Sequence, residues 1–126
     1  MRANRAENDL ANIGVEGVLS AWDEILSPDC EGAAPGQPLR PIAETREGDR
    51  VLYTAFPDYH RTFHNIVVEP PFAAVQWTMT GTQQGEFLGQ PASGRAASLS
   101  AMSLFEFVGG RVRRWWIYAN PPQLEG

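Results

Sequence analysis

A glycine-rich segment separates two strand-like runs in the second half of the chain, and it limits the folds that the chain can adopt. The segment spans residues 81–95, reads GTQQGEFLGQPASGR and contains four glycines, a proline and an arginine. Glycine permits left-handed backbone angles and the close approach of neighbouring backbone. The segment is therefore predicted to be a shaped excursion at the edge of a sheet and not a simple turn.

Apolar periodicity divides the chain into helices followed by strands. A helix is predicted over residues 10–26, with Asp9 as its N-cap, and a second helix over about residues 39–55, with loop at 32–38 between them. β-Branched and aromatic residues predict four strands, over residues 59–68, 72–80, 99–108 and 112–118. This order favours one α+β domain over residues 1–126, with the helices packed on one face of an antiparallel sheet.

The last two strands form a predicted hairpin around Gly109 and Gly110, and both of its faces are rich in apolar and aromatic residues. The predicted register pairs Val108 with Val112, Glu106 with Arg114, Phe105 with Trp115 and Ser103 with Ile117. The sheet of a small monomer usually leaves one face polar. Two apolar faces predict helices over one side and a second copy of the chain over the other, which makes a homodimer through the sheet face.

Composition disfavours several classes of function. The net charge is −5, whereas nucleic-acid binding needs a basic surface for phosphate contacts. No apolar run approaches the roughly 20 residues of a membrane helix, and the polar N-terminus does not resemble a signal peptide. Cys30 is the only cysteine, so an intrachain disulfide is impossible, and a reducing, cytoplasmic setting is predicted. The absence of lysine, with high Ala and Gly content, suggests a bacterial gene.

Several motifs occur in a fixed order and spacing. They are Ala55-Phe56-Pro57-Asp58, the run VQWTMTGT from Val75, the glycine-rich segment, Phe105-Glu106-Phe107, Gly110-Arg111-Val112 and Trp116. Together they resemble the SnoaL-like polyketide cyclase family of the NTF2-like superfamily, over about residues 36–121, whereas the first thirty residues match poorly. The resemblance implies a cone-shaped fold, in which a strongly curved sheet wraps around helices and encloses a pocket. It also implies a small hydrophobic ligand and chemistry that uses no metal or cofactor.

The resemblance points to two catalytic positions, and the chain departs from the family pattern at both. The family commonly has a catalytic Asp after the last-strand tryptophan, where this chain has Ile117, and the polar partner on the preceding strand falls at Ser103. Isoleucine cannot take a proton, and serine without a base is a poor nucleophile or acid. Asp58 is then the best carboxylate near the sheet, although Pro-Asp is also typical of turns. Asp58 and Ser103 remain the catalytic candidates.

One strand face is predicted to line the pocket and bind the ligand. Its residues are Tyr59, Phe63, Trp77, Met79, Phe105, Arg113, Trp115 and Ile117. Arg113 either binds an anionic substrate or pairs with an acid at the rim of the cone. His60 and His64 share a strand face, but no third ligand converges on them, so hydrogen-bonded surface or interface histidines are favoured over a metal site.

Two functional hypotheses follow. The first is a cofactor-independent cyclase or isomerase that transfers a proton within a polyketide- or steroid-like molecule. The second is a non-catalytic ligand-binding or dimerisation module that has lost the acid–base pair. A buried, hydrogen-bonded carboxylate or histidine inside the pocket would favour the enzyme, because such chemistry needs a base near a donor that stabilises an enolate or alkoxide.

Overall fold

The structure is a computed structural model that describes residues 2–87, 89–120 and 123–124. Its helices are α1 (Arg2–Glu7), α2 (Leu10–Ile25) and α3 (Arg46–Ala55), with a 3₁₀ turn, η1 (Ile42–Glu44). Its strands are β1 (Leu26–Ala33), β2 (Arg40–Pro41), β3 (His60–Glu69), β4 (Phe72–Thr82), β5 (Ala96–Val108), β6 (Arg111–Ala119) and β7 (Gln123–Leu124). The four predicted strands and the helix predicted over residues 10–26 are present. The second helix is shorter than predicted, because residues 40–44 form β2 and η1 and α3 begins only at Arg46. The elements α1, β1, β2 and β7 were not anticipated.

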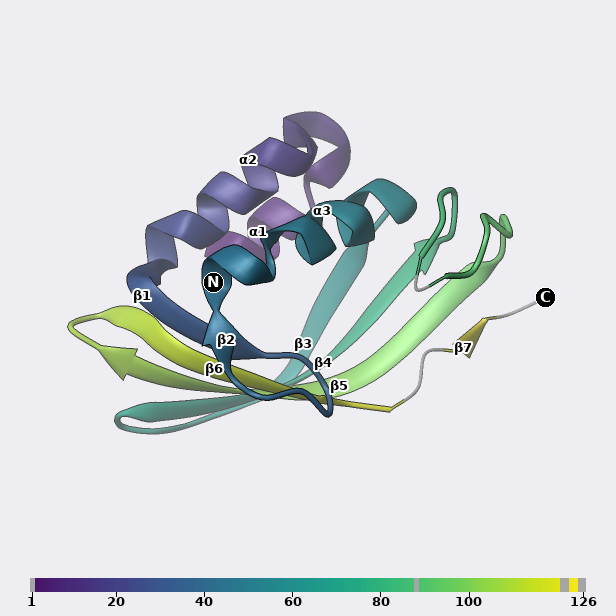
Figure 1. The fold of residues 1–126 in the computed structure, drawn as a ribbon. Helices are drawn as coiled ribbons and strands as arrows, with labels where there is room; N and C mark the ends of the chain where they lie inside the picture. The colour runs from purple at the N-terminus through teal and green to yellow at the C-terminus, as the bar shows by residue number, and fades with distance from the viewer. Residues whose placement is uncertain (1, 88, 121–122, 125–126) are drawn as a thin grey trace.

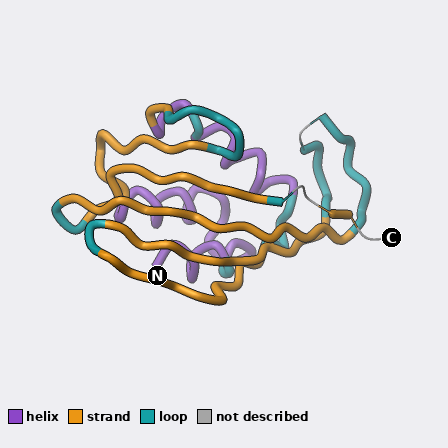
Figure 2. The backbone as a smooth tube through the Cα atoms, turned by 90° about the horizontal axis from the view of Figure 1, so that it is seen from below, coloured by secondary structure: helices purple, strands orange, loops and turns teal. Residues whose placement is uncertain are grey.

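The strands form one curved sheet in the order β2-β1-β6-β5-β4-β3, and β7 pairs with β5. The helices lie over the concave face of this sheet and leave the other face without helical cover (Figure 1). Figure 2, seen from below, shows the strands crossing in front of the helices. The predicted α+β fold, with its helices on one face of a curved sheet, is confirmed. The sheet is mixed, because β1 runs parallel to β6.

Strand β1 illustrates a structural element that the local sequence does not predict. Its sequence, LSPDCEGA, lacks alternation and contains both proline and glycine. It forms a strand because it pairs with β6, and in this pairing Gly32 lies opposite Trp115. A Cβ atom on Gly32 would lie 3.3 Å from the indole of Trp115, so glycine allows this close approach. Trp115 in turn packs against Trp22 of α2, with ring centroids 5.6 Å apart.

The β5–β6 hairpin follows the predicted register at three of the four pairs. Glu106 faces Arg114, Phe105 faces Trp115 and Ser103 faces Ile117. The fourth pair is wrong, because Val112 pairs with Phe107 and not with Val108. A β-bulge beside Glu106 and Phe107 absorbs the difference. The bulge leaves Val112 fully buried in the interior.

The glycine-rich segment packs as a shaped excursion against the C-terminal end of α3. The backbone amide of Gln84 donates to the carbonyl of Ala55 at 2.7 Å. Gln83 is buried, and its Nε2 lies 3.2 Å from each of three carbonyl oxygens, those of Gly85, Gln90 and Pro91. One buried amide thus organises the excursion. In the part of the chain that the structure describes, no helix is long and apolar enough to cross a membrane.

Candidate functional site

A buried carboxylate, Glu7, lies at the contact between α1 and the interior face of the sheet. Its side chain is 0% exposed. Its Oε2 accepts a hydrogen bond from the Tyr53 hydroxyl at 2.7 Å, and its Oε1 lies 3.3 Å from Nη1 of Arg61. Acidic side chains are almost never fully buried unless they are paired. Glu7 is therefore a buried, hydrogen-bonded carboxylate in the interior of the fold.

Sequence analysis missed Glu7 for a physical reason. The sequence of α1, RANRAE, has no apolar periodicity and looks like a solvated terminus. The side-chain amide of Asn8 fastens this helix to β3 by hydrogen bonds to the backbone of Arg61. The chain fold brings Glu7 to partners far along the sequence, and no local pattern reports that contact.

Aromatic side chains surround the ion pair. The Tyr53 hydroxyl, which donates to Glu7, accepts a hydrogen bond from Nε1 of Trp22 at 3.2 Å. The Arg61 guanidinium donates to the Tyr59 hydroxyl and lies 4.1 Å from the centre of the Trp77 ring. Such cation–π contacts are attractive, most of all where the cation is desolvated. Tyr59 and Trp77, both predicted as pocket residues, therefore belong to this cluster.

Burial sets the protonation states in the cluster. It raises the pKa of Glu7, against the lowering effects of Arg61 and the Tyr53 hydrogen bond. Burial also raises the pKa values of the Tyr53 and Tyr59 hydroxyls. The Glu7 carboxylate raises both values further, whereas the Arg61 guanidinium acts to lower them. Both phenols therefore stay protonated at neutral pH and can act as hydrogen-bond donors.

Hydrogen bonding at this contact is incomplete. Among the described residues, the buried atoms Asn4 Oδ1, Glu7 Oε1 and Arg61 Nε have no hydrogen-bond partner. Glu7 Oε1 keeps its charge contact with Arg61, but this contact lacks hydrogen-bond geometry. An unsatisfied buried polar group costs about 1–3 kcal/mol. A free donor beside a free acceptor is typical of a place that takes up water or the polar group of a ligand.

A second carboxylate, Asp49, lies on α3 one turn before Tyr53, so the two residues share a helix face. Asp49 is half-buried, and its carboxylate accepts no hydrogen bond from any described residue. Burial is the main reason that its pKa is raised to about 6. The Arg46 and Arg61 guanidinium groups act to lower this pKa, whereas the Glu7 carboxylate acts to raise it. A carboxylate with free lone pairs and a pKa near neutrality is suited to accept a proton.

The two catalytic candidates from the sequence lie elsewhere. Asp58 is exposed, and its Oδ1 accepts a hydrogen bond from the backbone amide of Thr82 at 2.7 Å, which ties the start of β3 to the end of β4. Partial burial acts to raise the Asp58 pKa, but the hydrogen bonds from Thr82 outweigh it and lower the pKa. Ser103 is buried and accepts a hydrogen bond from Trp77 Nε1 at 2.8 Å. Asp58 thus makes the contacts of a turn residue, and Ser103 supports an interior tryptophan.

The other predicted pocket residues divide into two groups. The interior group packs in or against the core and consists of Phe63, Met79, Phe105, Trp115 and Ile117. Arg113 instead pairs with acids of β1, with Nε 3.2 Å from Asp29 Oδ2 and Nη1 3.3 Å from Glu31 Oε1. Of the two roles considered for Arg113, the structure shows the pairing with acids.

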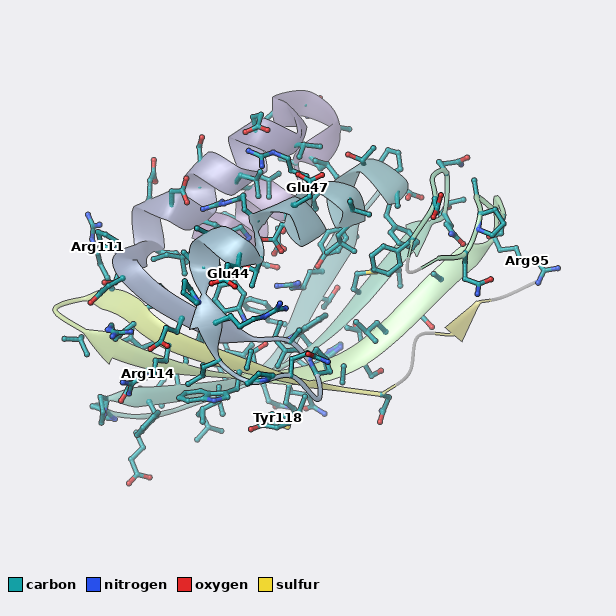
Figure 3. The ribbon with its side chains drawn as sticks, viewed as in Figure 1. Glu44, Glu47, Arg95, Arg111, Arg114 and Tyr118 are labelled. Carbon is teal, nitrogen blue, oxygen red and sulfur yellow. The ribbon has the colours of Figure 1, made fainter. Side chains whose placement is uncertain are left out.

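The outer face of the sheet carries the histidines and a shallow hollow. His64 Nε2 lies 2.9 Å from Thr78 Oγ1, and the hollow of about 310 Å³ also contacts Gln76, Met102 and Tyr118. Figure 3 shows Tyr118 on the side of the sheet that faces away from the helices. Across the described ranges, no three His, Cys, Asp or Glu side chains gather in a way that could hold a metal ion.

Comparison with known proteins places this geometry in a family. The family model of the SnoaL-like polyketide cyclases matches residues 3–125. The match therefore includes the N-terminal helices, which the motif resemblance over residues 36–121 did not cover. No curated protein matches the chain.

Several solved structures share the fold of this chain. AclR from Streptomyces galilaeus, proposed to be a hydroxylase, is 26% identical, with a TM-score of 0.81 over 94% of this chain and 84% of that one. TsrD from Streptomyces laurentii is 27% identical, with a TM-score of 0.75 over 94% and 85%. A protein from Jannaschia sp. CCS1, proposed to be a SnoaL-like polyketide cyclase, is 24% identical, with a TM-score of 0.78 over 94% and 83%.

Proposed function

The chain belongs to the SnoaL-like polyketide cyclase family, and from that premise we propose that it moves a proton within a hydrophobic, polyketide- or steroid-like molecule without a cofactor. The reaction would take place between the helices and the concave face of the sheet. The observation that carries the proposal is the Glu7–Tyr53–Arg61 cluster, a buried carboxylate held by a phenol and a guanidinium. An interior with this chemistry supports an acid–base role.

The residues of the cluster have complementary roles in this proposal. Asp49 accepts the proton, because its carboxylate is free of hydrogen bonds from described residues and its pKa is about 6. Arg61, whose Nε–H has no hydrogen-bond partner among the described residues, donates to the oxygen on which negative charge develops, as a preorganised donor does in a site shielded from water. Asp49 thus takes the place of the carboxylate that Ile117 cannot supply.

The non-catalytic alternative accounts for less of the structure. A module that only dimerises, or that binds an uncharged ligand, needs no charged groups in its interior, and burying an ion pair is costly. The interior nevertheless keeps Glu7, which is 0% exposed, and Arg61, whose side chain is 11% exposed. The free-energy cost of burying these two groups is explained if they take part in an acid–base reaction, and this favours the enzyme hypothesis over the binding module.

Proton abstraction can be tested without knowing the natural substrate. Aromatic β-keto esters and steroid ketones would be incubated with the protein in D₂O, and deuterium uptake next to the carbonyl would be followed by mass spectrometry. We expect protein-dependent uptake for at least one compound and a fall of about 100-fold or more in Asp49→Asn. Glu47→Gln, which removes an exposed acid of the same helix, should leave the rate unchanged. Equal uptake with and without protein for every compound would favour the binding module.

A further inference from the structure

The Glu7 carboxylate is bound by Arg61 and Tyr53 as a ligand would be. We infer that Arg61, with the Tyr53 and Tyr59 hydroxyls, forms a binding site for the carboxylate of a hydrophobic monocarboxylic acid, and that Glu7 occupies this site until such a ligand enters. The inference concerns the cluster of the proposed function, but binding at Arg61 requires no turnover. Its test is therefore independent of the deuterium experiment.

The first support is the chemistry of the site. Arg61 is nearly buried, its guanidinium lies over the Trp77 ring, and it donates to the Tyr59 hydroxyl. A planar guanidinium can bind a carboxylate through two parallel hydrogen bonds. Glu7 does not use this capacity, because Arg61 Nε and Glu7 Oε1 both lack a hydrogen-bond partner among the described residues. A ligand carboxylate, not constrained by a helix backbone, could engage Nε as well.

The second support is the way in which α1 is held. Its sequence, RANRAE, contains no apolar side chain larger than alanine. The contacts of Glu7 and Asn8 with β3 and α3 are an ion pair and hydrogen bonds. A helix of six residues is not stable by itself, and segments with few buried apolar contacts open at low free-energy cost. A ligand can therefore displace α1 and Glu7 without disrupting the core.

The surroundings define the class of ligand. The rings of Tyr59 and Trp77 lie against the guanidinium, which suits a ligand with an aromatic or polycyclic body. The nearby Asp49 carboxylate would repel a second negative charge. An acid with one carboxylate and a flat apolar body therefore fits the site best.

The test uses 2-naphthoate and its methyl ester as matched probes, titrated into the full-length protein and followed by calorimetry. If Glu7 competes for the site, Glu7→Gln should tighten the binding of 2-naphthoate by about tenfold or more. The ligand then no longer has to displace a charged side chain, so a larger fraction of the protein is competent to bind it. Asn8→Ala, which loosens α1 and keeps Glu7, should tighten it to a smaller extent. Arg61→Met should abolish binding, and the ester should show no preference among the variants.

Two surface variants control for the change of charge. Glu47→Gln and Arg50→Met alter exposed residues of α3, whose side chains are 81% and 42% exposed, and should bind 2-naphthoate like the unmodified protein. The inference is overturned if Glu7→Gln and Asn8→Ala bind 2-naphthoate no more tightly than the unmodified protein, or if Arg61→Met binds it equally well. If Glu7→Gln does not fold, the comparison of Asn8→Ala with Arg61→Met decides the matter.

Discussion

The side-chain amide of Asn8 binds both backbone polar groups of Arg61. Asn8 Nδ2 donates to the Arg61 carbonyl at 2.9 Å, and the Arg61 amide donates to Asn8 Oδ1 at 2.7 Å. A residue directly after α1 thus forms hydrogen bonds with two backbone groups near the start of β3. This contact positions Glu7 against the Arg61 side chain, and it ties the placement of the carboxylate to one exposed asparagine.

Removing this contact should loosen α1 and leave the rest of the fold in place. In Asn8→Ala we expect faster amide hydrogen exchange over residues 2–8, with a loss of global stability of about 1 kcal/mol. Hydrogen exchange with mass spectrometry measures the first quantity and urea unfolding the second. Asn12→Ala, whose amide bonds only to Asp9 nearby, is the control. Unchanged exchange over residues 2–8 would contradict the role assigned to Asn8.

The Tyr53 hydroxyl joins Trp22 to Glu7, so its removal should be costly. Tyr53→Phe leaves Glu7 Oε2 and Trp22 Nε1 without these partners in a buried site. We expect the free energy of unfolding to fall by about 1–3 kcal/mol, measured with urea. Tyr118→Phe, at a residue that is 64% exposed, should change it little. Equal effects of the two substitutions would mean that the hydrogen bonds of Tyr53 are energetically unimportant.

The raised pKa of Asp49 makes a prediction about pH. The folded state holds the proton more tightly than the unfolded state, because burial lifts the pKa from 3.8 to about 6. The contribution of Asp49 to the free energy of unfolding should therefore decline as the pH rises from about 4 to about 6, and stay constant above pH 6. Asp49→Asn removes the decline, so its stability relative to the unmodified protein should rise by about 3 kcal/mol as the pH rises across that window.

Urea unfolding at several pH values checks this dependence on Asp49. Glu47→Gln, at a solvated position of the same helix, should show no trend with pH relative to the unmodified protein. A constant difference between Asp49→Asn and the unmodified protein from pH 4 to pH 7 would refute the assignment of the raised pKa.

Gln83 should govern the order of the glycine-rich excursion. Gln83→Ala leaves the carbonyls of Gly85, Gln90 and Pro91 without its amide, and removes the acceptor of Ser93 Oγ. We expect a loss of about 2 kcal/mol and faster cleavage by trypsin after Arg95. Gln84→Ala is a matched control, because that side chain is exposed and its backbone bond to Ala55 remains. Trypsin sensitivity that is the same in both variants would exclude this role.

The homodimer through the outer sheet face stays a prediction. That face exposes Met102 at 48% and Tyr118 at 64%, and no helix of the described chain covers it (Figure 1). Light scattering at micromolar concentration should give twice the 13.9 kDa chain mass. Tyr118→Glu should shift the protein toward monomer, whereas Val51→Glu on the helical side should not. A monomeric mass for the unmodified protein would rule out the dimer at that concentration.

Local patterns determined much of the scaffold. Alternation and β-branched residues identified β3, β4, β5 and β6, and the Gly109–Gly110 turn gave most of the hairpin register. These features are visible in the sequence because strand pairing across a short turn depends on neighbouring residues. The bulge beside Phe107 was not visible, because it depends on how Val112 is buried.

The candidate site depended on the tertiary structure. Ser103 and Asp58 were found from motifs, yet the motifs could not show that Asp58 fastens a turn or that Ser103 supports Trp77. Glu7 meets Tyr53, a residue 46 positions later in the chain. A carboxylate in a polar terminal segment looks solvated until the fold buries it. The sequence alone determined the family scaffold, whereas the tertiary structure decided which charges lie inside it, because burial depends on distant partners.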